Sequence, residues 1–213
     1  KNLKKKMKKL VTILFALMLT FSLSAQVSGG VKIGTNFANI ANTEYIDWDT
    51  RVGLQTGGFM VFEIGDVFQI KPELIYTQKG ATVDFFGGGL GSYIIKQTIA
   101  LNYLELPVYF GWNIAESGFC INTGPYLALL LSARAKMDGN YNTLGTGSSS
   151  SESFYDECNP IDLGFNFGCS YTIAEHFVID SRYGIGLINI PDDEWEDDIW
   201  LNSVISLSFG YQF

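Results

Sequence analysis

The sequence contains very little histidine and cysteine, and these two shortages exclude several kinds of site. Its single histidine is His176, so a Ser/His/Asp triad would depend on one residue in a short predicted turn. The three cysteines are Cys120, Cys158 and Cys169, and their spacing contains no CxxC pair, which argues against a zinc site or a disulfide framework. We therefore predict that the protein is not an enzyme and uses no cofactor or structural metal.

The sequence also lacks a hydrophobic run long enough for a transmembrane helix. The longest run, residues 10–23, has about 14 residues, whereas a spanning helix needs about 20. Six lysines precede this run and Ser24-Ala25-Gln26 follow it, which is the pattern of a secretory signal peptide. We predict cleavage after Ala25, with cleavage after Ser24 as the alternative, so that residues 1–25 are the signal peptide and 26–213 form one domain.

Basic residues are scarce in the remaining chain. Without the six N-terminal lysines it has 8 basic and 22 acidic residues, a formal charge of about −14. Nucleic acid is excluded as a partner because its binding requires a surface rich in lysine and arginine.

The chain is rich in residues that favour strands and tight packing. It has 23 glycines, 16 phenylalanines and 11 tyrosines, a composition that predicts an all-β fold. Apolar residues alternate with small or polar ones in eight segments, which is the two-residue period of a strand with two different faces. The eight segments are residues 27–38, 51–64, 67–80, 94–112, 118–133, 161–173, 177–189 and 199–213.

The connections between these segments alternate in length. Those after the second, fourth and sixth segments are short, and those after the first, third, fifth and seventh are longer. Short turns at one end and long loops at the other are typical of an outer-membrane barrel with periplasmic turns and extracellular loops. We therefore predict an eight-stranded antiparallel up-and-down transmembrane β-barrel in the cell outer membrane. We interpret residues 81–93, which contain Gly87-Gly88-Gly89, and residues 134–160, which are rich in glycine, serine and asparagine, as loops.

The longest segment, 94–112, changes phase in the middle. Its apolar residues occupy odd positions up to Leu101 and even positions from Leu104 onward. A β-bulge near Asn102 and Tyr103 would place all of these apolar residues on one outward face.

Alternation alone does not show which face points into the barrel. A soluble lipocalin-like periplasmic barrel, which binds a ligand, would have its apolar face inside. The polar face of this chain is dominated by glycine, serine and asparagine, which suit the narrow interior of eight strands and favour the membrane alternative. The large aromatic residues near strand ends would then form the two interfacial girdles. These are Phe68, Trp112, Tyr171, Phe177 and Phe213 near the turns, and Tyr76, Tyr93 and Tyr103 towards the loops.

Six charged residues are predicted to lie inside the barrel at similar heights. Three are basic and three acidic, and unpaired charges in a narrow lumen would be costly, so we expect them to pair. They are Lys32, Lys71, Glu73, Glu105, Asp180 and Arg182. A structural ion cluster that fills the lumen is one interpretation, and a narrow pore or ion path is the alternative.

Two further segments are candidate sites. The acidic segment before the last strand is a candidate weak cation-binding loop, although its spacing differs from that of an EF-hand. Its carboxylates are Asp192, Asp193, Glu194, Glu196, Asp197 and Asp198. The final aromatic residues, Tyr211 and Phe213, are predicted to form the signal read by the outer-membrane assembly machinery.

Several stretches together resemble the PorT-like outer-membrane β-barrel family of Bacteroidetes-type bacteria. They are Gly30 to Phe37, Pro72 to Gly80, Leu101 to Val108, Gly124 to Leu127, Asp180 to Tyr183 and Gly186-Leu187. The resemblance implies an eight-stranded outer-membrane barrel with a structural or accessory role, in contact with lipid and with an envelope or secretion-machine protein. It implies no catalytic residues.

Overall fold

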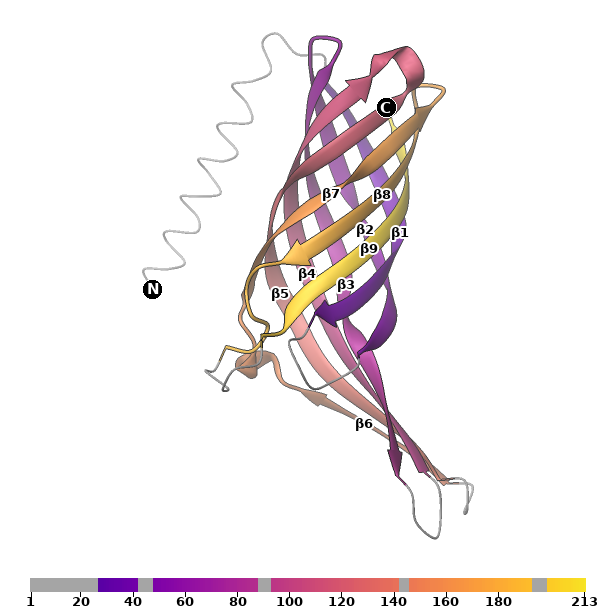
Figure 1. The fold of residues 1–213 in the computed structure, drawn as a ribbon, viewed down its shortest axis with the longest axis vertical. Coiled ribbons are helices and arrows are strands. Elements are labelled where there is room, and N and C mark those ends of the chain that lie inside the picture. Colours follow the sequence, from indigo (N-terminus) through magenta and orange to yellow (C-terminus); the bar gives the residue numbers. More distant parts are fainter. Residues whose placement is uncertain (1–26, 42–47, 88–92, 142–145, 193–198) are drawn as a thin grey trace.

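Nine β-strands make up most of the computed structural model, which describes residues 27–41, 48–87, 93–141, 146–192 and 199–213 (Figure 1). The predicted signal peptide, residues 1–25, lies outside the described residues. The strands are β1 (Val27–Ala41), β2 (Asp49–Ile64), β3 (Phe68–Gly87), β4 (Tyr93–Ile114), β5 (Phe119–Tyr141), β6 (Thr146–Ser153), β7 (Ile161–Ile173), β8 (Phe177–Gly186) and β9 (Leu201–Gln212). Two short 3₁₀ turns, η2 (Ala115–Ser117) and η3 (Tyr155–Glu157), complete the described elements.

Eight of these strands form a closed antiparallel ring, which confirms the predicted fold. The sheet order is β4-β3-β2-β1-β9-β8-β7-β5-β6, and the additional pairing of β4 with β5 closes the ring without β6. The first and last strands pair from Gly30 opposite Gln212 to Ala41 opposite Leu201. Closure gives every ring strand two neighbours, so the ring itself has no free sheet edge.

The two ends of the barrel differ as the sequence predicts. At one end, here called the turn end, β2 joins β3, β4 joins β5 and β7 joins β8 through short connections. The C-terminus also lies at the turn end, which is at the top of Figure 1. The opposite end, here called the loop end, carries the longer connections. The turn between β7 and β8 places Ala174 and Glu175 at φ 49° and 64°, as a tight hairpin with right-handed twist requires.

The apolar face of the ring points outward. Large exposed side chains alternate with buried ones in the ring, for example exposed Val31 and Ile33 on either side of buried Lys32. Exposed apolar residues also include Leu54, Met60, Phe110, Trp112, Phe165, Phe167, Leu207 and Phe209. A lipocalin-like barrel needs the opposite arrangement, so the soluble alternative is wrong.

Glycines on the inner face make room for large inward side chains. A Cβ added to Gly30 would lie 2.3 Å from the ring of Phe59, and one added to Gly164 would lie 2.4 Å from the ring of Tyr126. Separations this short are steric clashes, so these glycines allow aromatic rings to fill a lumen that is only eight strands wide.

The predicted change of face in β4 is wrong, although a register shift occurs at the expected height. Asn102 pairs with Ser132 and Tyr103 with Leu130, so the extra residue is Leu131 of β5. The phase of β4 stays constant, and Leu101 and Tyr103 are buried inside the barrel, 0% and 1% exposed. Tyr103 is therefore not part of an outer aromatic girdle. The odd apolar positions of β4 line an apolar zone inside the loop end, which the sequence pattern did not reveal.

Two segments that we interpreted as loops are largely strands. The outer parts of β3 and β4 form one hairpin, and β6 pairs with the outer part of β5 from Thr146 opposite Tyr141 to Ser153 opposite Arg134. Together, residues 82–87, 93–98, 136–141 and 146–153 form a four-stranded sheet that projects from the loop end, at the lower right of Figure 1. We call this sheet the arm. Its glycine- and serine-rich sequence concealed it, because such residues are usually depleted in strands.

The outer surface changes from apolar to charged where the ring becomes the arm. On β4, outward-facing Leu104 is followed along the same face by Thr98 and exposed Lys96. Lys96 lies between Asp84 of β3 and Asp138 of β5, so the same surface carries a row of charges across the arm. A charged outer surface belongs in water. The apolar belt, which is the band of exposed apolar side chains around the ring, therefore ends where the arm begins.

Candidate functional site

The lumen contains a buried ion cluster near the middle of the barrel. Five of the six charged residues selected from the sequence meet there, and all five are buried. We call this group the lower cluster: Lys32 of β1, Lys71 and Glu73 of β3, and Asp180 and Arg182 of β8.

Glu73 is the centre of the lower cluster. Its carboxylate accepts hydrogen bonds from both terminal nitrogens of Arg182, at 2.8 and 2.9 Å, and from Nζ of Lys32 at 2.8 Å. Arg182 also donates to Asp180 at 2.8 Å. The bidentate Arg182–Glu73 pair joins β8 to β3 across the lumen, which is the strong geometry for an arginine and a carboxylate.

Aromatic rings pack against the remaining faces of the cations. The guanidinium carbon of Arg182 lies 3.8 Å from the ring centroid of Tyr109, and Nζ of Lys71 lies 4.2 Å from that of Phe59. Lys71 is also 3.7 Å from a Glu73 oxygen and 3.6 Å from an Asp180 oxygen. Arg182 and Lys71 therefore each contact both carboxylates and the face of an aromatic ring.

The sixth selected residue, Glu105, lies in a separate group closer to the loop end. Its carboxylate is 2.8 Å from Nζ of Lys79, which is 3.5 Å from Asp162. Asp162 accepts hydrogen bonds from the Tyr126 hydroxyl and the Asn202 side chain, both at 3.0 Å. We call Lys79, Glu105 and Asp162 the upper cluster.

Sequence reasoning missed Lys79 and Asp162, although a signal was present for each. Asp162 occupies an even-numbered position of β7, as do Gly164 and Asn166, and the alternation places these positions inside the barrel. Lys79 occupies an odd-numbered position of β3, as do Lys71 and Glu73, and the alternation places all three inside the barrel.

The two clusters balance each other in charge. The lower cluster has three cations and two carboxylates, and the upper cluster has one cation and two carboxylates. Asn166 links them, because its side chain donates to Glu105 at 3.3 Å and to the Tyr109 hydroxyl at 3.0 Å. The eight charged groups of the two clusters therefore sum to zero, and each lies beside a group of opposite charge, as buried charges require.

An apolar plug fills the lumen at the loop end. It is built from buried side chains of the ring and of the connections: Ile40, Ala81, Ile99, Leu101, Tyr103, Tyr126, Ala128, Leu130, Ala133, Cys158 and Ile190. Trp48, Phe154 and Trp200 pack against it, and the two tryptophans make an edge-to-face contact at 5.3 Å. Burial, together with the nearby carboxylates of Glu157 and Asp192, raises the pKa of the Cys158 thiol to about 11.

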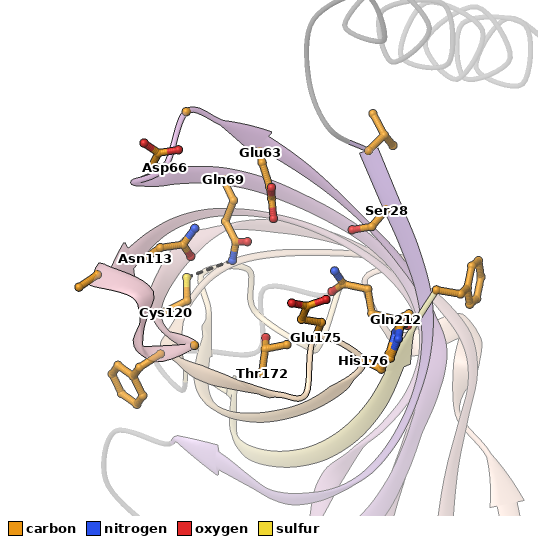
Figure 2. A pocket seen from close by; sticks show the side chains of 16 residues that line it. Ser28, Glu63, Asp66, Gln69, Asn113, Cys120, Thr172, Glu175, His176 and Gln212 are labelled. Carbon is orange, nitrogen blue, oxygen red and sulfur yellow. Dashed lines mark hydrogen bonds between the residues drawn. The ribbon is translucent and has the colours of Figure 1, made fainter.

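A polar vestibule opens at the turn end. It is a cavity of about 750 Å³ with Glu63, Gln69, Thr172 and Glu175 on its walls (Figure 2). Gln69 donates a hydrogen bond to Sγ of Cys120 at 3.0 Å. The vestibule therefore ends on the turn-end side of the lower cluster. The two ion clusters and the apolar plug separate it from the loop end.

The single histidine lies on the rim of this vestibule. Its Nδ1 is 3.0 Å from the main-chain oxygen of Gln212, and its ring stacks on that of Tyr211 at 5.5 Å. Since a carbonyl oxygen accepts, Nδ1–H is the donor. His176 therefore attaches the β7–β8 turn to the last strand.

The candidate assembly signal lies at the same end. Phe213 is 73% exposed, and its main-chain N–H donates to Gly29 at 2.8 Å, so its ring projects from the seam that closes the barrel. Tyr211 is also exposed on the outer face. Of the candidate cation-binding loop, Asp192 is exposed, while residues 193–198 lie outside the described residues.

The described residues contain no group of three or more His, Cys, Asp or Glu side chains placed to hold a metal ion. None of the helices among these residues is long and apolar enough to span a bilayer.

Comparisons with known proteins identify a family. The sequence profile of the family described as "Outer membrane protein beta-barrel domain" matches residues 21–192. A search of curated proteins finds no match.

Several solved structures are distantly similar to this chain. Ail, the attachment invasion locus protein of Yersinia pestis, is 15% identical, with 88% of this chain and 99% of that chain covered and a TM-score of 0.45. Neisserial surface protein A is also 15% identical, with coverage of 88% and 99% and a TM-score of 0.44. OprG from Pseudomonas aeruginosa is 15% identical, with coverage of 89% and 97% and a TM-score of 0.34. At these scores the likeness adds nothing to the strand pairing described above.

Proposed function

We propose, from the premise that this chain belongs to the family of outer membrane protein beta-barrel domains, that it is a non-conducting accessory protein of the cell envelope. The protein is an integral outer-membrane β-barrel, and its apolar exterior lies in outer-membrane lipid. Its turn end, with the vestibule, would face the periplasm, and its loop end, with the arm, would face outward.

The filled lumen is the observation that carries this proposal. The apolar plug occupies the loop end. The eight charged groups of the lower and upper clusters, which lie between the plug and the vestibule, are paired with one another. An ion crossing the barrel would have to break these pairs and then enter a zone of aliphatic and aromatic side chains. Both steps are costly, so the filled lumen argues against the narrow pore.

The contacts of His176 join two elements. The imidazole stacks on Tyr211 and donates its Nδ1–H to the main-chain carbonyl of Gln212 in the last strand. We propose that this histidine stabilises the closing strand.

The arm is the surface that supports an accessory role. It projects beyond the apolar belt as a single-layer sheet, whereas a sheet in water normally packs its apolar face against a second layer. We propose that an envelope or secretion-machine protein supplies this layer, in agreement with the resemblance to PorT-like barrels. Assignment to the PorT branch itself stays a prediction.

The experiment is purification of the full chain from its own membrane in mild detergent. We expect one partner to co-purify in a fixed ratio with the native chain and to be lost when the arm is shortened. The shortened variant would join residue 81 to 99 and residue 135 to 154 through short turns, which keeps the pairing of the ring except for Asp49 opposite Thr82 at the end of β2. A matched control, Glu63→Gln in the vestibule, should retain the partner.

Planar-bilayer recording separates the two alternatives. We expect no conductance from the native barrel. A lone barrel that conducts ions would support the pore and overturn the accessory proposal, and a lone barrel without conductance would leave only a structural role.

A further inference from the structure

The arm has an unprotected sheet edge. β6 pairs with β5 and is the last strand in the sheet order, so alternate N–H and C=O groups along its outer side have no strand partner among the residues that the structure describes. Natural edge strands usually carry lysine, proline or a bulge that prevents further pairing. The sequence of β6 is Thr-Gly-Ser-Ser-Ser-Ser-Glu-Ser. It contains no lysine and no proline, and Glu152 is its single charged residue.

The other edge of the arm is less open. It is formed by the outer part of β3, where Asp84 and Phe85 are both exposed. A charge and a large ring hinder the approach of another strand, whereas Ser149, Ser150 and Ser151 of β6 are small and exposed.

We propose that the outer edge of β6 binds an extended polypeptide strand of a protein partner by β-strand addition. This inference rests on the proposed accessory function and names the chemistry of the partner. Main-chain hydrogen bonds would supply affinity, and the side chains on alternate positions would supply selectivity.

The two faces of the arm define the pattern of the added strand. One face has partly exposed apolar side chains, with Phe85 45% and Met137 44% exposed, and the opposite face carries Asp84, Lys96 and Asp138. Next to the outer edge, the apolar face carries only small residues, namely Gly139 of β5 and Ser150 of β6. A strand with apolar residues at every second position would extend the apolar face beyond β6.

A second copy of the chain is a poorer occupant. Copies in one membrane share one orientation, so two β6 edges that project along the membrane normal would meet as parallel strands. Parallel pairing is slightly less stable per residue than antiparallel pairing, and β6 offers no large side chains to compensate. A separate polypeptide can enter in the antiparallel direction.

The test uses the full chain in lipid nanodiscs and a fluorescent peptide, Lys-Val-Thr-Val-Thr-Val-Thr-Lys, as the probe. We expect saturable binding by fluorescence anisotropy, absent with the shortened arm. Two versions of the peptide, N-methylated on alternate amides in opposite phases, should differ by at least about tenfold in Kd, because only one phase removes donors that face β6.

Two proline variants, Ser149→Pro and Ser150→Pro, locate the binding edge on the chain. Adjacent residues direct their N–H groups to opposite sides of a strand, so one variant removes an outward donor and the other a β5–β6 ladder bond. We expect the outward variant to weaken peptide binding by about tenfold with the arm still paired, as judged by amide hydrogen exchange in β5. No saturable binding, or equal binding by both N-methylated peptides, would overturn the proposal.

The native partner distinguishes this inference from the proposed function. If the partner co-purifies with the native chain and equally with both proline variants, the accessory function stands and the edge assignment fails. If no partner co-purifies with the native chain, the accessory function fails whatever the peptide does. Sedimentation of the native chain alone would reveal pairing between copies, which would replace the proposed occupant.

Discussion

At the scale of single residues, the charge balance around them distinguishes two buried carboxylates, those of Glu73 and Glu105. Glu73 offsets three cations in the lower cluster, which already has one cation in excess. Glu105 belongs to the upper cluster, which has one carboxylate in excess. Removing one charge therefore increases the imbalance in the first case and cancels it in the second.

This difference predicts the order of two variants. Glu73→Gln should lower the free energy of unfolding by about 3–5 kcal/mol, because a buried charge loses its partner. Glu105→Gln should cost clearly less, since the amide oxygen can still accept from Lys79. Urea unfolding in lipid vesicles, followed by tryptophan fluorescence, measures both, with Glu63→Gln as the control. An equal loss in both variants would contradict the division into two clusters.

The thiol of Cys158 gives a prediction on pH dependence. In a Cys120→Ser, Cys169→Ser variant it is the remaining cysteine, and its pKa of about 11 leaves little thiolate at neutral pH. Because the thiolate is the nucleophile, alkylation by iodoacetamide should speed up about tenfold per pH unit from pH 8 to 10. In the urea-unfolded chain the alkylation rate should level off near pH 9. If the rate levelled off near pH 9 in the folded protein as well, the plug would not enclose this residue.

At the scale of elements, the last strand has two separable features. Its main chain closes the ring by pairing with β1, and its outward aromatics end at Phe213. The polar side chains that it turns inward are small and uncharged, such as Asn202 and Ser208. β9 therefore contributes closure and a terminal aromatic rather than ion pairs.

Deletion of Phe213 tests the second feature. We expect a several-fold drop in the amount of folded barrel in the outer membrane, measured by heat-modifiable migration in gels. Phe213→Leu keeps the main-chain pair with Gly29 and should show the same defect if the aromatic ring is the signal. Phe209→Leu, four residues earlier on the same face, is the matched control and should assemble normally. Normal assembly of both Phe213 variants would refute the signal.

At the scale of the whole molecule, the switch from apolar to charged outer surface sets the depth of the barrel in the membrane. Leu104 lies within the apolar belt of β4, and Lys96 lies in the arm on the same face. At about 3.3 Å per residue these positions are roughly 26 Å apart along the strand.

Cysteine labelling in liposomes tests this placement. In a background without native cysteines, Lys96→Cys should react with a membrane-impermeant maleimide at least about tenfold faster than Leu104→Cys, because lipid shields the second position. Similar rates in detergent-unfolded samples would show that the two thiols are equally reactive by themselves. Similar rates in the liposomes would mean that the arm does not stand clear of the bilayer.

The sequence by itself determined the eight ring strands, their outward apolar face and the lumen position of five charged residues that meet. These features follow from a two-residue period, which is local and survives in any single strand. Tertiary structure alone decided the rest. Leu101 and Tyr103 point inward because neighbouring strands and loops form an apolar plug there, and Glu105 pairs with Lys79 because strand register sets their heights. The arm exists because β5 and β6 pair beyond the ring, and such pairing depends on neighbours that a linear pattern does not contain.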